Sequence, residues 1–316
     1  TSLSGDGRST LEEVVAAAKL RGYRALAITD HAEGTLSGVG RDALLEQRAQ
    51  IVALRRELGD SLALLQGVEL NIGPAGELDY DAEFRRGFDF CIASVHDHFD
   101  LDRAAQTRRV VTAMHDPAVR MIGHLSARMI GGRPPIELDL DAVVAAAEET
   151  ETALEVNGGL PRLDMSVHAL QRAKSRSSKV TFVLTSDAHH YDELERVRYA
   201  ALNAERAWIE TDRVANARGA ESLLSWVRRA STALAAGLLV LGAARTAGAD
   251  NSNPNLIPLG ETEAFLGNAG VARANDTSRP GATPSARPRG SPFSPTSASS
   301  SASATPSFLR RTTSAT

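Results

Sequence analysis

The sequence predicts an α/β fold with a mainly parallel sheet. Short apolar runs alternate with stretches of helical periodicity through about the first two thirds of the 316 residues, a pattern typical of helices covering a parallel sheet. The strand-like runs are short and apolar throughout, and six of them follow one another. Six such strands fit a barrel better than a two-layer fold, and the chain is long enough for a barrel, which takes roughly 200–250 residues.

The first predicted helix begins near Ser9, which is placed to cap it, with Glu12 three residues on as the other half of a capping box. Apolar residues then recur at helical spacing until Gly22 ends the helix. A short buried strand follows over 25–29. The later strand-like runs are Ala63–Glu69, Phe88–Val95, Met121–Gly123, Ala153–Val156 and Val180–Thr185. The helical stretches between them are Arg41–Leu58, Leu101–Met114, Leu140–Glu149 and Met165–Lys174.

The composition changes near residue 230. Residues 231–245 form an apolar segment too short for a membrane span, which needs roughly 20 residues. Residues 246–316 are rich in Ala, Ser, Thr and Pro and offer little to bury, so we expect a disordered tail. After Asp276 the tail contains arginines but no acidic residue. This composition favours a solvated tail and also allows contact with a polyanion. A foreign sequence, from a frameshift or readthrough, is a third interpretation. Residues 1–230 are the predicted folded domain.

The overall charge and the cysteine count narrow the class of protein. A net charge of −4 gives no general attraction to nucleic acid or to an anionic membrane. The single cysteine, Cys91, excludes an internal disulfide, fits a reducing cytoplasmic location, and lies in an apolar run typical of a buried structural thiol. No secretory signal opens the chain, and neither a glycine-rich phosphate loop nor a Ser-His-Asp order is present.

Side chains that can bind a metal follow almost every predicted strand. They are Asp30, His31, Glu69, His96, His124, Asp187 and His189. Taken singly, each has an ordinary structural role, because an aspartate after a strand often caps a helix and a lone histidine is more often a hydrogen-bonding group. Together they would lie at one rim, where the carboxyl ends of parallel strands meet, and would repel one another without a cation. Carboxylate and imidazole without thiolate suit Zn, Mn or Fe.

The order of these motifs resembles the PHP (polymerase and histidinol phosphatase) superfamily, with the closest likeness to the PHP domain at the C-terminus of bacterial family X DNA polymerases. The resemblance runs from Thr1 to about Arg228. It is carried by the segments 5–13, 27–31, 67–69, 93–96, 122–124, 154–157 and 185–189. The segments 131–135 and 161–164 resemble the polymerase-linked branch in particular.

The resemblance implies a distorted (β/α)7 barrel that holds two or three divalent metal ions. The implied ligands are Asp6, His31, Glu69, His96, His124, Asp187 and His189, and the implied catalytic residues are Glu69, Asp187 and His189. Glu69 matches the carboxylate that bridges two metals. Asp30 is expected behind the ligands, holding His31 by its other ring nitrogen. Arg128 and Arg162 are candidate phosphate contacts, since guanidinium pairs with phosphate in a two-pronged geometry.

One departure from the family concerns the start of the chain. Family members begin the barrel with a strand that ends in His-x-His followed by Thr or Ser, and Thr1 matches that following residue. We therefore expect a barrel without its first strand and without two histidine ligands. We also expect an open edge beside the next strand, weaker metal binding and lower stability.

The function implied is that of a metal-dependent phosphoesterase. The first hypothesis is hydrolysis of DNA phosphodiester bonds at 3′ ends, as a 3′-5′ exonuclease in DNA repair. The second is a stand-alone phosphatase for small phosphomonoesters of the histidinol-phosphatase kind. The third is an inactive fragment or scaffold. The expected partner is a phosphate ester, with no membrane partner, and the sequence does not set the oligomeric state.

Overall fold

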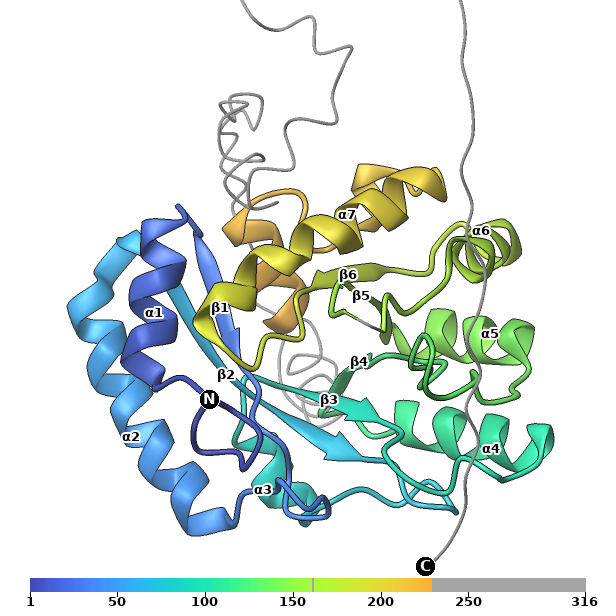
Figure 1. Ribbon diagram of the computed structural model, residues 1–316, viewed down its shortest axis with the longest axis horizontal. Coiled ribbons are helices and arrows are strands. Elements are labelled where there is room, and N and C mark those ends of the chain that lie inside the picture. The colour runs from blue at the N-terminus through green and yellow to red at the C-terminus, as the bar shows by residue number, and fades with distance from the viewer. Residues whose placement is uncertain (161, 229–316) are drawn as a thin grey trace, which may run out of the picture. The chain divides into compact units, whose positions relative to one another are not determined.

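Six parallel strands stand side by side in chain order and form a curled half-barrel with helices between them (Figure 1). The computed structural model describes residues 1–160 and 162–228. The strands are β1 (Ala25–Ile28), β2 (Ala63–Asn71), β3 (Phe90–Ser94), β4 (Val119–Ile122), β5 (Ala153–Asn157) and β6 (Phe182–Thr185). The predicted α/β class is confirmed. The apolar segment 231–245, the tail 246–316 and the domain boundary near 230 lie outside the described residues.

Helices follow the strands and cover the outer face of the sheet. They are α1 (Leu11–Leu20), α2 (Arg41–Leu58), α3 (Ala82–Arg86), α4 (Arg103–Met114), α5 (Leu140–Thr150), α6 (Val167–Arg176) and α7 (Val197–Arg206), with short 3-10 turns η1 (Gly59–Ser61), η2 (Tyr191–Arg196) and η3 (Thr211–Arg213). In Figure 1 α4, α5 and α6 lie in a row, while α1 and α2 lie together beside β1. No helix in the described ranges is long and apolar enough to cross a membrane.

The cap of α1 differs from the prediction. Thr10, not Ser9, is the capping residue. The Glu13 carboxylate accepts a hydrogen bond from the Thr10 backbone nitrogen at 2.9 Å and completes the capping box. Ser9 is buried instead, and its Oγ accepts a hydrogen bond from the backbone nitrogen of Tyr191 at 2.9 Å. Ser9 does not cap α1 because its hydroxyl is used in a tertiary contact with η2.

Both faces of the sheet are buried, which explains why the strands read as continuous apolar runs. Along β3, Phe90 and Ile92 face inward, where they join Trp226 in the interior cluster. Cys91 and Ala93 face outward into the main core under the helices. Cys91 is fully buried and free, as the sequence predicts.

Among the described residues the sheet does not close, and the side chain of Asn216 covers part of its β6 edge. Within the described chain no strand pairing joins β6 back to β1. At the β6 edge the amide of Asn216 bonds both the nitrogen (3.0 Å) and the oxygen (2.7 Å) of Leu184, in the manner of a neighbouring strand. The carboxyl ends of all six strands point to one rim, and the candidate ligands lie there.

Candidate metal centre

Glu69 is the centre of the group at the rim. It sits in β2, and its carboxylate meets imidazoles that follow three other strands. Oε1 lies 3.2 Å from His96 Nε2 and 3.0 Å from His124 Nε2. Oε2 lies 3.4 Å from His31 Nδ1. Glu69, His31 and His96 present one ligand atom each within 4.8 Å of one another, the spacing needed to hold one cation.

A second group shares His31. Its Nε2 lies 3.3 Å from Asp6 Oδ2, and His189 Nε2 lies 3.5 Å from the same oxygen. His189 Nδ1 lies 3.0 Å from the backbone carbonyl of Asp187, so Nε2 is the nitrogen that faces Asp6. The ligand atoms of Asp6, His31 and His189 also lie within 4.8 Å of one another. Residues from the first loop, the end of β1 and the end of β6 thus make up this group.

The hydrogen bonds around His96 test whether a cation fits. Asn71 Nδ2 donates to Asp79 Oδ2 at 3.0 Å, so Asn71 Oδ1 faces the His96 ring and accepts from Nδ1 at 2.6 Å. His96 Nε2 is then left with a lone pair, is buried, and has no hydrogen-bond partner in the described structure. A lone pair facing a carboxylate oxygen is unfavourable unless a cation or a proton lies between them. The donor set therefore fits a divalent metal ion.

Charge couples the members of the first group. Burial alone would raise the pKa of Glu69, but its electrostatic interactions with His96 and His124 outweigh burial and hold that pKa well below its usual range. Burial also disfavours protonated His124, yet the hydrogen bond and charge of Glu69 raise its pKa. For His96, burial prevails and lowers the pKa. A metal ion that takes His124 as a ligand would displace the proton that Glu69 favours on it.

Comparison with known proteins shows the family of this chain. The family model described as PHP domain matches residues 1–158, which is half of the chain. The chain belongs to the PHP domain family. The DNA polymerase/3'-5' exonuclease PolX of Bacillus subtilis is 34% identical over 226 residues, which cover 71% of this chain and 39% of that protein. This chain thus spans about two fifths of the polymerase's length.

Other PHP relatives are described as phosphatases. A probable phosphatase of Shewanella sediminis is 27% identical over 72% of this chain and 91% of its own length. A solved structure of histidinol phosphate phosphatase from Lactococcus lactis, complexed with zinc, L-histidinol and phosphate, superposes with a TM-score of 0.48 and 21% identity over 66% of this chain and 92% of that chain. The family match and the relatives at the sequence level support a metal-dependent phosphoesterase.

Asp187 lies beside both groups of this PHP domain without joining either. Its Oδ2 lies 3.2 Å from Arg162 Nε and accepts a hydrogen bond from Asn157 Nδ2 at 3.1 Å. Its Oδ1 is 3.9 Å from His189 Nδ1. The backbone of Asp187 has a φ of 49°, in the left-handed region, which turns the carboxylate back toward β5. The structure therefore places Asp187 at the rim, paired with Arg162.

Asp30 does not hold the His31 ring. Its carboxylate accepts hydrogen bonds from Gln47 Nε2 (2.6 Å), Ser4 Oγ (3.0 Å) and Thr1 Oγ1 (2.9 Å). Ser4 Oγ in turn accepts from the backbone nitrogen of His31 at 3.0 Å. Successive side chains of an extended segment point to opposite sides, so Asp30 turns away from the ring and toward α2. Its influence on His31 passes through Ser4 and the backbone.

Arg128 and Arg162 differ in what they contact. Arg128 donates from Nε to the carbonyl of Arg162 at 3.0 Å and from Nη2 to the carbonyl of Leu163. It therefore acts on the loop rather than directly on the rim. Arg162 Nη1 is buried and has no hydrogen-bond partner in the described structure, although Nε faces Asp187. An unpaired guanidinium nitrogen beside the metal ligands is suited to an anionic substrate.

Sequence reasoning gave no role to Asn71 or Glu155. Glu155 is almost fully buried in the middle of β5, where Oε1 accepts from Thr185 Oγ1 at 2.6 Å and Oε2 accepts from the backbone nitrogen of His124 and from Asn157 Nδ2. Burial raises the pKa of Glu155 to about 7. The signal that could have indicated it is a charged residue inside the apolar run of β5. Nothing in the local sequence marked Asn71, because its role depends on a partner 25 residues away.

Proposed function

We propose that this PHP domain hydrolyses phosphodiester bonds at the 3′ ends of DNA. The observation that carries the proposal is the placement of an unpaired arginine nitrogen, Arg162 Nη1, beside the carboxylate and imidazole groups of the rim. The similarity to a polymerase with 3'-5' exonuclease activity supports the choice of DNA ends. The buried, unpaired state of the single thiol fits a cytoplasmic enzyme.

Two or three divalent ions, Mn, Zn or Fe, are proposed as cofactors. Glu69, His31, His96 and His124 would hold one ion, and Asp6, His31 and His189 another, with Asp187 beside both groups and paired with Arg162. Ions held there supply positive charge against the phosphate oxygens and an acidified water as nucleophile.

The protein's own groups have distinct tasks in this proposal. Glu69 gathers three imidazoles around one carboxylate, so it fixes the geometry of the rim. Arg162 binds a phosphate oxygen through Nη1, and Asp187 orients its guanidinium. His189 is the most exposed of the rim histidines, with 34% of its side chain accessible, so an ion held by its Nε2 lies on the side of the rim that substrate reaches first.

The test compares two substrates with the purified chain and added Mn²⁺. Release of nucleotides from 3′-labelled single-stranded DNA is measured beside hydrolysis of p-nitrophenyl phosphate. The proposal expects a higher kcat/KM on DNA and loss of both activities in Glu69→Gln. Preference for the small monoester would contradict the proposal and favour a second candidate, a small-molecule phosphatase. The match to nearly the full length of a probable phosphatase supports this second candidate. No hydrolysis of either substrate would leave the scaffold hypothesis.

A further inference from the structure

A guanidinium–aromatic pair lies on the loops next to the proposed metal ligands. The Cζ atom of Arg133 lies 3.8 Å from the centroid of the Phe99 ring. Phe99 follows His96 by three residues at the end of β3, and Arg133 belongs to the loop that follows His124 at the end of β4. Both side chains are half-buried. The pair therefore stands at the same rim, between two strand ends that carry ligands.

The backbone holds Arg133 in place. Its Nε donates to the carbonyl of Ala127 at 2.7 Å, and Ala127 in turn donates from its nitrogen to the carbonyl of His124 at 2.7 Å. Met129 and Arg133 exchange two backbone hydrogen bonds that close the turn between them. Arg133 is thus connected to the end of β4 through a short chain of hydrogen bonds, and its position is pre-organised relative to His124.

The charge of Arg133 is not neutralised by the protein. Within residues 1–160 and 162–228 no carboxylate oxygen lies within 4.0 Å of it, and its Nη1 and Nη2 make no hydrogen bond. Burial lowers its pKa, and the positive charge of Arg162 lowers it further. Two cationic groups that repel each other at the entrance of a site are stabilised by an anion that contacts both.

We propose that Phe99 and Arg133 form a subsite for the nucleotide next to the scissile phosphate, so that the substrate is a single-stranded polynucleotide rather than a lone phosphomonoester. This inference rests on the proposed function. Arg162 contacts the phosphate that is cleaved, while Arg133 contacts the neighbouring nucleotide. The guanidinium, supported on one face by Phe99, offers its other face to a base and its terminal nitrogens to a phosphate oxygen. Stacking of this kind tolerates any base, because every base has a π-face.

The test uses the ratio of two catalytic efficiencies in each variant. The first is kcat/KM for removal of nucleotides from a short 3′-labelled oligothymidylate, and the second is kcat/KM for p-nitrophenyl phosphate, which has neither a base nor a second phosphate. The ratio is expected to fall about tenfold in Arg133→Ala and about fivefold in Phe99→Leu, the size of one lost stacking contact. Arg133→Lys keeps the charge and loses the planar face, so its ratio falls between that of Arg133→Ala and that of the unsubstituted chain.

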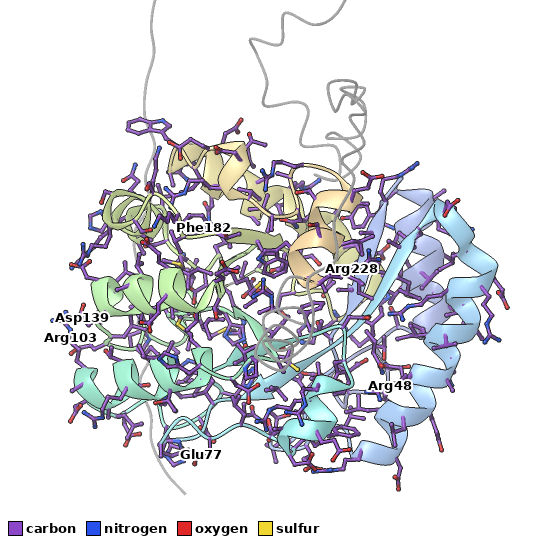
Figure 2. The ribbon with its side chains drawn as sticks, turned by 180° about the vertical axis from the view of Figure 1, so that it is seen from behind. Arg48, Glu77, Arg103, Asp139, Phe182 and Arg228 are labelled. Carbon is purple, nitrogen blue, oxygen red and sulfur yellow. The ribbon has the colours of Figure 1, made fainter. Side chains whose placement is uncertain are left out.

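Arg103→Ala is the matched control. Arg103 is an exposed arginine at the start of α4 whose charge is already paired with Asp139 at 3.1 Å, and Figure 2 labels the two side by side. Its ratio is expected to stay at the unsubstituted value. An unchanged ratio in both Arg133→Ala and Phe99→Leu would overturn the subsite.

A second measurement separates this inference from the proposed function. Binding of a fluorescent oligothymidylate to the metal-free protein is followed by anisotropy, which needs no catalysis. About tenfold weaker binding in Arg133→Ala supports the subsite even if the chain hydrolyses nothing, whereas equal binding in the two proteins overturns it. Failure of hydrolysis alone counts against the proposed function and not against the subsite.

Discussion

Asn71 Oδ1 lies 2.6 Å from His96 Nδ1, and this contact decides which nitrogen of His96 faces Glu69. Asn71 is itself fixed because its Nδ2 donates to Asp79 Oδ2. The relay from Asp79 through Asn71 keeps the hydrogen on Nδ1 and leaves Nε2 as a metal-binding lone pair 3.2 Å from the Glu69 carboxylate. A group that orients a ligating histidine commonly changes metal affinity by 10- to 100-fold when it is removed.

Asn71→Leu is therefore expected to weaken binding of Mn²⁺ or Zn²⁺ by about 10- to 100-fold, because His96 loses the acceptor that fixes its tautomer. Titration calorimetry measures the affinity, and the ¹⁵N shifts of the His96 ring report the tautomer directly. Asn71→Asp, which keeps an acceptor at this position, should recover part of the affinity. A variant with unchanged affinity and unchanged ring shifts would contradict the role of Asn71.

Glu155 should make the stability of the metal-free protein depend on pH. Its folded-state pKa, raised by burial from 4.5 to about 7, favours the neutral form. The stabilisation from this group is complete below pH 4.5 and is lost as pH rises through 7. Glu155→Gln is neutral at every pH, so the loss of unfolding free energy between pH 5 and 8 should shrink by about 3 kcal/mol in urea denaturation with EDTA present. Glu57→Gln, on the exposed side of α2, serves as control and should leave the slope unchanged.

Arg128 should affect substrate binding only through its effect on the position of Arg162. Arg162→Ala is expected to raise KM for the phosphate ester by about 10- to 100-fold, the cost of a lost charged hydrogen bond. Arg128→Ala should raise KM less, because it only positions the carbonyls of Arg162 and Leu163. In a double-mutant cycle the effect of Arg128→Ala should then disappear in the Arg162→Ala background. Independent, additive effects would show that Arg128 contacts the substrate itself.

Arg109 should matter for stability rather than for chemistry. Its fully buried side chain donates to the carbonyls of Ile72, Asp97 and His98, and so holds the loop that follows His96. Arg109→Met removes the donor that the three carbonyls share, although the His98 carbonyl keeps Gln106 Nε2, and should lower the free energy of unfolding by about 3 kcal/mol. Arg108→Met, on the exposed side of the same helix, should change it by less than about 0.5 kcal/mol. Chemical denaturation of the two variants in parallel decides the point.

Metal binding should strengthen as pH rises. The proton that Glu69 stabilises on His124 must leave before a metal binds, and the raised pKa of His124 moves this release to higher pH. We expect the affinity for Mn²⁺ to increase across pH 6 to 8, and addition of a chelator to lower the melting temperature of the loaded protein. An affinity independent of pH would mean that His124 binds no metal, and His124→Ala provides the comparison.

The sequence by itself determined the α/β class, the order of the strands and the rim at which His31, Glu69, His96, His124 and His189 meet. The reason is that strands buried on both faces are continuously apolar, so a charged residue at the end of such a run stands at the edge of a parallel sheet. Burial of Cys91 followed from the same composition.

Only the tertiary structure decided which atoms face one another. Ser9 accepts a hydrogen bond from Tyr191 instead of capping α1, Asp30 bonds Gln47 instead of the His31 ring, and Asp187 pairs with Arg162. Asn71, at the end of β2, bonds His96, which follows β3. Residue spacing fixes the face and the level of a side chain, but a hydrogen bond depends on ångström-scale distances between segments far apart in the chain. These contacts arise from packing, and no local pattern encodes them.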